Sequence, residues 1–301
     1  MEYIPAKSIV IRAKKPGHWF GIDYNMNIYK GCNHGCIYCD SRSECYGIKE
    51  FDKVKAKEDA LRIIRDELRR KVKKGVVATG AMSDPYNSFE EELKLTRHAL
   101  ELLDAFDFGV SIATKSSLIT RDIDILQSIQ EHSPVLCKIT ITTSDDILAK
   151  KIEPGVPTSS ERFEVVKALS KQGIFTGILL MPVLPFINDT EENVMSIVEQ
   201  ADQAGAKFIY PAFGVTLRDN QRDWYYQKLN ELFPDDGYVE KYRNQFGDYY
   251  ECRCRGAGKL YRMLEKECSQ RGMYYKMADI VRAYKRGYEA KQMSIYDILT
   301  K

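Results

Sequence analysis

Short apolar runs alternate with stretches of helical period along most of the chain. Six runs have the length and the β-branched content of buried strands, at 25–30, 76–79, 109–114, 135–142, 175–181 and 208–213. The stretches between them repeat apolar residues three and four positions apart, which is typical of amphipathic helices, at 56–74, 88–106, 119–131, 159–171 and 190–204. The pattern therefore predicts strand–helix units in succession.

The stretch 88–106 illustrates the pattern. Five of its positions form one stripe at helical spacing: Phe89, Leu93, Thr96, Leu100 and Leu103. Asn87 or Ser88 can cap its start, and the glutamates at 90–92 complement the positive end of the helix dipole. We therefore predict one continuous helix here.

Six strand–helix units predict an α/β fold with a parallel sheet and right-handed crossovers. Since a closed barrel of this kind needs eight units, we expect a partial (β/α)6 TIM-like barrel. After about residue 215 helical patterns dominate, at 220–232, 258–270 and 278–290. The expected domains are a core at 1–215, with a short N-terminal lead-in, and a helical C-terminal extension at 216–301.

Composition narrows the class of protein. Hydrophobic residues make up 44% of the 301 residues and charged residues 29%, which is typical of a folded chain. A net charge of +2 neither establishes nor excludes a nucleic-acid partner, because a basic groove can exist within a balanced total. The sequence shows no membrane-spanning apolar run and no signal-peptide core, so we expect a cytoplasmic protein without membrane contact.

Four of the eight cysteines lie within fourteen positions, which favours metal or redox chemistry over disulfides. Cys32, Cys36 and Cys39 could hold three irons of a cubane cluster, since soft sulfur ligands suit such clusters. The fourth iron would stay open for S-adenosylmethionine (SAM). An alternative is a zinc site formed by the three cysteines with His34 or a distant ligand.

Distinctive segments follow all six predicted strands, and parallel strands bring such segments to one rim. They read GCNHGCIYCD, GAMSDPYN, TKSS, TTSDD, MPVLP and PAFGVT. We therefore expect one cavity at this rim, with the cysteine loop beside it.

The cysteine spacing, with Tyr38 before Cys39, resembles the signature of the radical SAM superfamily. Further segments resemble its spore photoproduct lyase-like family, over about residues 19–233: NIYKGCNHGCIYCDSR, GAMSDPYN, TKSSLITRDIDIL, ITTSDDILAKKIEPGVPTSSERF and FGVTLRDNQRDWYYQKL. The resemblance implies a partial (β/α)6 barrel, one [4Fe–4S] cluster, SAM and reductive cleavage of SAM to a 5′-deoxyadenosyl radical. It also implies a reducing partner such as flavodoxin or ferredoxin.

The resemblance also implies roles for residues around SAM. Tyr38 would lie near the adenine. The loop after the second strand would contact the SAM amino group; it lacks the common Gly-Gly-Glu pattern, so backbone carbonyls such as that of Ala81, with Ser83 or Asp84, would serve. Lys115 would bind the SAM carboxylate, or else lie on the surface.

Four further residues have two interpretations each. Thr143 and Ser144 could bind the ribose hydroxyls or cap the following helix. Tyr86 could contact substrate or shape a turn. Arg162 could touch SAM or pair with Glu153.

Photoproduct lyases return a hydrogen atom to the repaired base, and the resemblance implies a cysteine donor near the second loop. GAMSDPYN contains no cysteine, so photoproduct repair itself is doubtful. Cys45 is the candidate substitute, although a small buried residue is an alternative for it, and Cys137 is expected in the core.

The C-terminal part leaves two questions open. Cys252, Cys254 and Cys268 could bind a second metal. A nucleic-acid groove could form from the basic segment at 253–267 with Arg218, Arg222, Trp224 and Tyr225, or these residues could belong to a solvated helical face.

Three functions therefore compete. They are a radical SAM enzyme with an unknown substrate, which could be a nucleic acid or nucleoside, a DNA photoproduct-type lyase, and a non-catalytic module that binds zinc or nucleic acid.

Overall fold

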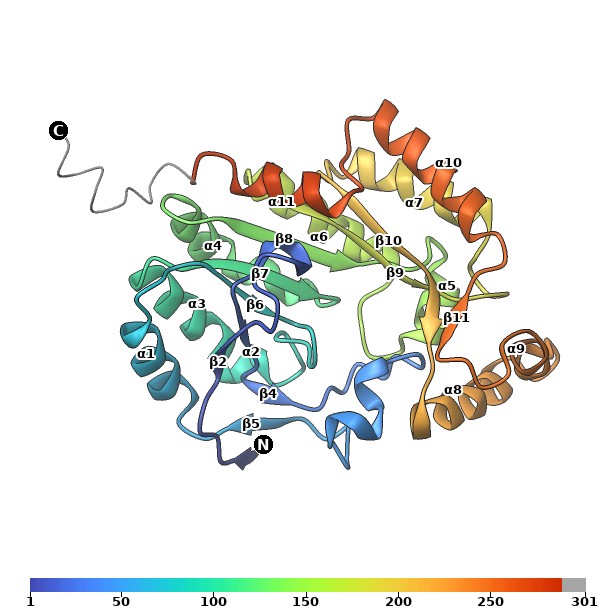
Figure 1. Cartoon of the computed structure of the whole chain (residues 1–301), viewed down its shortest axis with the longest axis horizontal. Helices are drawn as coiled ribbons and strands as arrows, with labels where there is room; N and C mark the ends of the chain where they lie inside the picture. The colour runs from blue at the N-terminus through green and yellow to red at the C-terminus, as the bar shows by residue number, and fades with distance from the viewer. Residues whose placement is uncertain (289–301) are drawn as a thin grey trace.

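A computed structural model of the protein describes residues 1–288 (Figure 1). Its main sheet has eight strands in the order β11-β10-β9-β8-β7-β6-β3-β2. Six neighbouring strands run parallel: β3 (Tyr24–Met26), β6 (Val76–Thr79), β7 (Gly109–Thr114), β8 (Val135–Thr140), β9 (Thr176–Val183) and β10 (Ile209–Thr216). The predicted six-stranded parallel sheet is confirmed. The first strand, predicted at 25–30, is shorter than expected, because only its first half forms β3 and its end forms a strand of a smaller sheet.

Antiparallel strands, β2 (Val10–Arg12) and β11 (Glu251–Arg253), extend the sheet at its two ends. These two strands do not pair with each other, so the sheet stays open and forms a partial barrel. The connecting helices are α1 (Ala60–Arg70), α3 (Leu95–Ala105), α4 (Ile123–Gln130), α5 (Asp146–Ile152), α6 (Ser159–Lys171) and α7 (Glu191–Gln203). A smaller sheet joins β1 (Glu2–Ile4), β5 (Lys55–Lys57) and β4 (Tyr29–Lys30).

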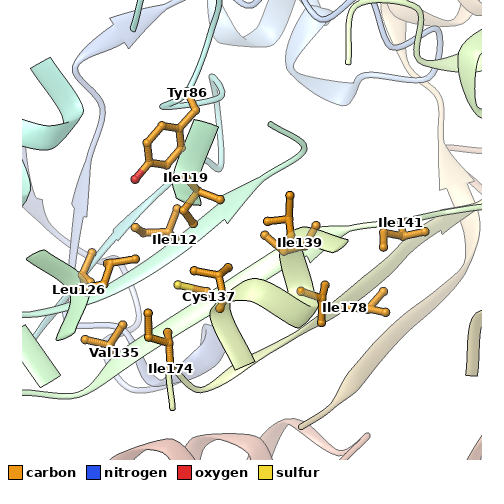
Figure 2. Packing of buried hydrophobic residues seen from close by; sticks show 14 of the residues in the cluster. Tyr86, Ile112, Ile119, Leu126, Val135, Cys137, Ile139, Ile141, Ile174 and Ile178 are labelled. Carbon is orange, nitrogen blue, oxygen red and sulfur yellow. The ribbon is translucent and has the colours of Figure 1, made fainter. Parts of the chain in front are cut away.

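The period of two along β8 separates the helix-covered core from the barrel interior. Val135, Cys137 and Ile139 belong to the core between the sheet and the helices (Figure 2). Leu136 packs among the residues of the interior, and Lys138 lines a cavity there. Cys137 is fully buried, as expected.

The continuous helix predicted at 88–106 was wrong. The segment forms α2 (Glu90–Leu93) and α3, separated by Lys94, whose φ of 52° is left-handed. Glu90 is fully buried rather than a solvated first-turn charge. Its carboxylate accepts hydrogen bonds from the Thr96 amide at 2.9 Å and from Arg121 at 3.1 Å. The period of apolar residues does not reveal this break, because the contacts of Glu90 involve a distant segment.

The C-terminal part contains α8 (Asp219–Leu232), α9 (Tyr238–Phe246), α10 (Ala257–Gln270) and α11 (Met277–Lys285). It also supplies β11, which the sequence pattern did not predict. The predicted helix at 278–290 corresponds to α11, and its last two positions lie outside the described residues. α11 contacts the 3-10 turn η1 (Trp19–Gly21), where the Tyr284 hydroxyl donates to the Phe20 carbonyl at 2.7 Å. Together they cover the N-terminal end of the barrel interior.

No helix within residues 1–288 is long and apolar enough to cross a membrane.

Candidate functional site

A cavity of about 410 Å³ opens inside the partial barrel. Its wall combines the cysteine loop with the carboxyl ends of the parallel strands, as the sequence pattern predicted. Its lining includes Trp19, Tyr38, Cys39, Asp40, Ala81, Asp84, Lys115, Lys138 and Thr140.

The cysteine loop follows β4 and is fixed by backbone contacts to two other loops. The Cys32 amide donates to the Phe51 carbonyl at 2.8 Å, and the Gly155 amide donates to the His34 carbonyl at 2.9 Å. A Cβ at Gly155 would lie 2.8 Å from that carbonyl oxygen, so only glycine allows this approach. The loop therefore has a defined position relative to the barrel.

All three thiols of the loop are reduced. Cys36 is buried, and Cys32 and Cys39 are half-buried. Burial raises the pKa of Cys36 and Cys39, and it raises the pKa of Cys32 to about 11. The charge of Lys115 acts against this rise at Cys36 and Cys39. Three soft sulfur donors beside one cation, with Cys39 on the cavity wall, fit an iron–sulfur cluster of low net charge.

Lys115 is the cation at the rim of the cavity. Burial alone would lower its pKa, but the charges of Cys36, Glu153 and Cys39 raise the pKa above its ordinary value. Its ammonium group lies over the ring of Tyr38, 5.6 Å from the centroid. A cation with this placement can bind an anionic group of a ligand at the rim.

Asp84 fixes the backbone that carries Lys115. Its Oδ1 accepts from the Thr114 hydroxyl at 2.7 Å, and its Oδ2 accepts from the Lys115 amide at 2.9 Å. His34 Nδ1 lies 3.5 Å from the same Oδ2. Asp84 therefore holds two loops of the rim together, and it also lines the cavity.

Two other residues of the second loop, Ala81 and Ser83, were also proposed to contact SAM. Ala81 lines the cavity. The hydroxyl of Ser83 donates to the Gly31 carbonyl at 2.5 Å, which ties the second loop to the start of the cysteine loop.

The hydroxyl of Tyr38 is held by a buried ion pair. The Tyr38 hydroxyl donates to Glu153 Oε1, and Glu153 Oε2 lies 2.6 Å from Arg162 Nη2. Glu153 and Arg162 are both fully buried, and Arg162 also donates to the Thr140 carbonyl at 2.7 Å. Burial would raise the pKa of Glu153, but the charges of Arg162 and Lys115 lower it. Of the two interpretations for Arg162, the structure therefore shows the pair with Glu153.

Several candidate residues lie away from the cavity wall. Tyr86 is 1% exposed and packs in the core near Ile112 and Ile119 (Figure 2), which favours a packing role over substrate contact. Cys45 is exposed, in the short turn η3 (Glu44–Tyr46). Its sulfur is 3.4 Å from the Ser43 hydroxyl. The hydrogen-donor role of Cys45 stays a prediction that this placement does not support.

Thr143 and Ser144 are held by contacts around α5 and α7. The Thr143 hydroxyl accepts from the Asp145 amide at 3.2 Å. The Ser144 amide donates to Asn193 at 2.9 Å. The cap of α5 is Asp145, whose side chain accepts from the Ile147 and Leu148 amides, so neither Thr143 nor Ser144 caps this helix, and ribose binding stays a prediction.

The C-terminal cysteines are dispersed. Cys252 packs in the cluster beneath the cysteine loop, whereas Cys254 and Cys268 belong to the main core. Within residues 1–288, no three His, Cys, Asp or Glu side chains converge on a position for a single metal ion.

The predicted nucleic-acid groove is only partly exposed. Tyr225 is fully buried, so it cannot stack on a base. Arg222 donates to the carbonyls of Gly247 and Tyr249, both at 2.8 Å. Arg218 pairs with Asp40 at 2.7 Å and links β10 to the cysteine loop. These basic residues therefore have structural partners.

Sequence reasoning missed Lys138, which lines the inner end of the cavity with Trp19. The available signal was a lysine within the apolar run VLCKIT, in phase with Leu136 rather than Cys137.

The comparisons with known proteins concern the family and the fold. Residues 26–198 match the family described as Radical SAM superfamily. An uncharacterized protein of Mycobacterium tuberculosis (strain ATCC 25618 / H37Rv) is 30% identical over 230 residues, covering 74% of this chain and 67% of that protein. An uncharacterized protein of Methanocaldococcus jannaschii is 34% identical over 190 residues, covering 61% and 70%.

Solved structures show the same fold at low sequence identity. A spore photoproduct lyase variant with bound AdoMet and dinucleoside spore photoproduct gives a TM-score of 0.65 at 13% identity, covering 91% of this chain and 82% of that chain. A radical S-adenosylmethionine methyltransferase from Kitasatospora setae gives a TM-score of 0.53 at 11% identity, covering 81% and 51%. The sequence match over 26–198, joined to this fold and to the cysteine loop at the cavity, leads to one conclusion: the chain belongs to the radical SAM superfamily of enzymes.

Proposed function

We propose that Cys32, Cys36 and Cys39 hold a [4Fe–4S] cluster at which the enzyme reductively cleaves SAM to generate a 5′-deoxyadenosyl radical. One observation carries this proposal: Cys39, Tyr38 and Lys115 line the same cavity inside the barrel. When bound, the cluster supplies the electron that breaks a carbon–sulfur bond of SAM. The chain itself supplies binding, orientation and exclusion of water.

The residues of the rim have separate tasks in this proposal. Lys115 binds the SAM carboxylate, while Asp84 fixes the Lys115 backbone. Tyr38 lies against the adenine, and the Glu153 carboxylate fixes the Tyr38 hydroxyl. Backbone carbonyls around Ala81 accept from the SAM amino group. The barrel wall shields the reacting atoms from solvent.

The zinc alternative has less support. A structural zinc needs four ligands around one point, whereas three cysteines that bind different irons do not have to converge. Within the described residues, no such convergent set of side chains occurs. His34 Nδ1 is also turned toward Asp84.

Photoproduct repair is the second candidate, favoured by the fold similarity to spore photoproduct lyase. The cavity argues against it, because Cys39 is the one cysteine on its wall within residues 1–288. Cys39 is used as a cluster ligand in the proposal, so no thiol remains there to return a hydrogen atom. We therefore expect SAM cleavage without efficient photoproduct repair.

The test is anaerobic reconstitution followed by chemical reduction. We expect about four irons per chain, the brown colour of a [4Fe–4S] cluster, and conversion of SAM to 5′-deoxyadenosine. Protein that carries zinc and no iron after the same treatment would refute the proposal. Repair of a synthetic dinucleoside photoproduct, assayed in parallel, would favour the second candidate instead.

A further inference from the structure

A second lysine lies deeper in the cavity than the residues assigned to SAM. Thr114, the residue before Lys115, pairs with Ile139, so Lys115 is level with Thr140 across the sheet. Lys138 precedes Thr140 by two positions on the same strand. At about 3.3 Å per residue, Lys138 is about 7 Å further toward the N-terminal end of the barrel. We define the cavity floor as Lys138 and Trp19.

Lys138 has no counter-charge within residues 1–288. Its side chain is almost fully buried, and its Nζ donates to the Ser111 hydroxyl at 2.6 Å. Its Nζ also lies over the Phe20 ring, 4.6 Å from the ring centroid. No carboxylate pairs with it in the described residues, and burial lowers its pKa to about 7. A buried amine in this state costs folding free energy, and an anionic ligand would compensate it.

Trp19 provides an aromatic part of the same cavity wall. The indole is 43% exposed although it lines the cavity. Its ring is held edge-on against Phe20 at 5.1 Å and against Tyr210 at 5.6 Å between centroids. A fixed aromatic surface in the same cavity as a cation can bind an organic ligand that has an apolar body and one charged end.

We propose that the cavity floor is a substrate subsite for an organic anion, whose carboxylate or phosphate oxygens bind Lys138 while its apolar body packs against Trp19. The proposal deepens the proposed function and rests on it for the identity of the ligand as substrate. Lys115 takes the SAM carboxylate at the rim, so the two lysines bind different anions. Removing Lys138 therefore should not affect SAM.

The test uses the reconstituted holoenzyme with SAM and without reductant, so that SAM stays intact. Calorimetric titrations compare benzoate and phenyl phosphate with uncharged benzamide. We expect wild type to bind one of the two anions at least tenfold more tightly than benzamide. The tighter anion identifies the carboxylate or the phosphate as the preferred group.

The variant Lys138→Met keeps the length of the side chain and removes its charge. It should weaken anion binding at least tenfold and leave benzamide binding and SAM affinity unchanged, whereas the exposed-surface control Lys171→Met should change none of these. Trp19→Ala should weaken the binding of the anions and of benzamide to the same extent. It tests the same subsite if Lys138→Met does not fold.

Three results would overturn the subsite. They are absence of anion binding by wild type, equal anion affinity in wild type and Lys138→Met, and a loss of SAM affinity in Lys138→Met that matches the loss for the anion. Failure of the proposed function is a separate result, since wild type would then bind the anion but produce no 5′-deoxyadenosine after reduction.

Discussion

Lys115 and Lys138 come from neighbouring strands and line the same cavity, yet their charges have opposite environments. Lys115 lies among the sulfurs of the cysteine loop and the carboxylate of Glu153, which raise its pKa despite burial. Lys138 has a hydroxyl and an aromatic ring as neighbours, and burial lowers its pKa to about 7. Lys115 at the rim is therefore protonated at neutral pH, whereas Lys138 at the floor has a pKa close to neutral pH.

The difference teaches that burial alone does not fix the state of a charged side chain. At the rim, the protein itself supplies the opposite charge, so the cation is stable before any ligand binds. At the floor no such charge occurs among the described residues, so stabilisation has to come from a ligand. Four substitutions test this contrast.

The largest effect is expected where the rim loses one of its three sulfur ligands. Cys36→Ala should abolish the cluster and SAM cleavage completely, because two cysteines cannot hold the cubane with one open iron. Iron content, visible absorption and 5′-deoxyadenosine yield measure the outcome. The control is Cys45→Ser, which changes an exposed thiol and should keep all three. Retained cleavage in Cys36→Ala would contradict the assignment.

The second largest effect is expected from replacing Glu153, the buried carboxylate that pairs with Arg162. Glu153→Gln keeps the shape of the side chain but leaves the Arg162 charge buried and unpaired, which should cost about 3–5 kcal/mol of unfolding free energy. Chemical denaturation measures it. The matched control is Glu164→Gln, in an exposed pair with Lys167 at 3.1 Å, where the cost should stay below about 1 kcal/mol. Similar losses in both variants would contradict the role of burial.

A smaller effect is expected from removing the rim cation. Lys115→Met should weaken SAM binding by about tenfold to a hundredfold, as loss of a charge-assisted contact does. Equilibrium binding of SAM to the unreduced holoenzyme measures this change. Lys138→Met serves as the reciprocal control with unchanged SAM affinity. Equal effects of the two variants would remove the distinction between rim and floor.

The smallest effect is a dependence of stability on pH. The pKa of Lys138 is about 7 in the folded protein against 10.5 when unfolded, so the unfolded chain binds the extra proton between these values. Stability of wild type relative to Lys138→Met should therefore rise with pH from 7.5 to 9, by about 1.4 kcal/mol per unit at most.

The groups facing this amine do not obscure the measurement. Ser111 and Phe20 do not titrate, and burial raises the pKa of Cys137 on the same strand to about 12. Thermal unfolding of both holoproteins across this range measures the difference. Parallel curves would show that Lys138 keeps its proton in the folded state.

Much of the fold could be predicted from local pattern. The six parallel strands, α6 and most connecting helices agree with the periods of apolar residues, because burial of one face imposes these periods. The short strand β11 and the helix α9 were missed, since three residues of strand carry almost no periodic signal. The break at Lys94 was missed because Glu90 is held by distant partners.

Tyr86 and Lys138 show the same limit at the site. Tyr86 follows a loop that reaches the cavity, yet its ring turns into the core. Lys138 lies in an apolar run, yet its amine turns into the barrel interior. The sequence pattern suggested substrate contact for Tyr86, which is buried in the core, and did not single out Lys138.

The sequence by itself determined the order of strands and helices and the spacing of the three cysteines, because both depend on residues close together in the chain. Only the tertiary structure decided which lysine has a counter-charge, which aromatic ring faces the cavity and which carboxylate is buried. Those properties depend on distances between segments brought together by the barrel, and electrostatic energy follows such distances rather than separation along the chain.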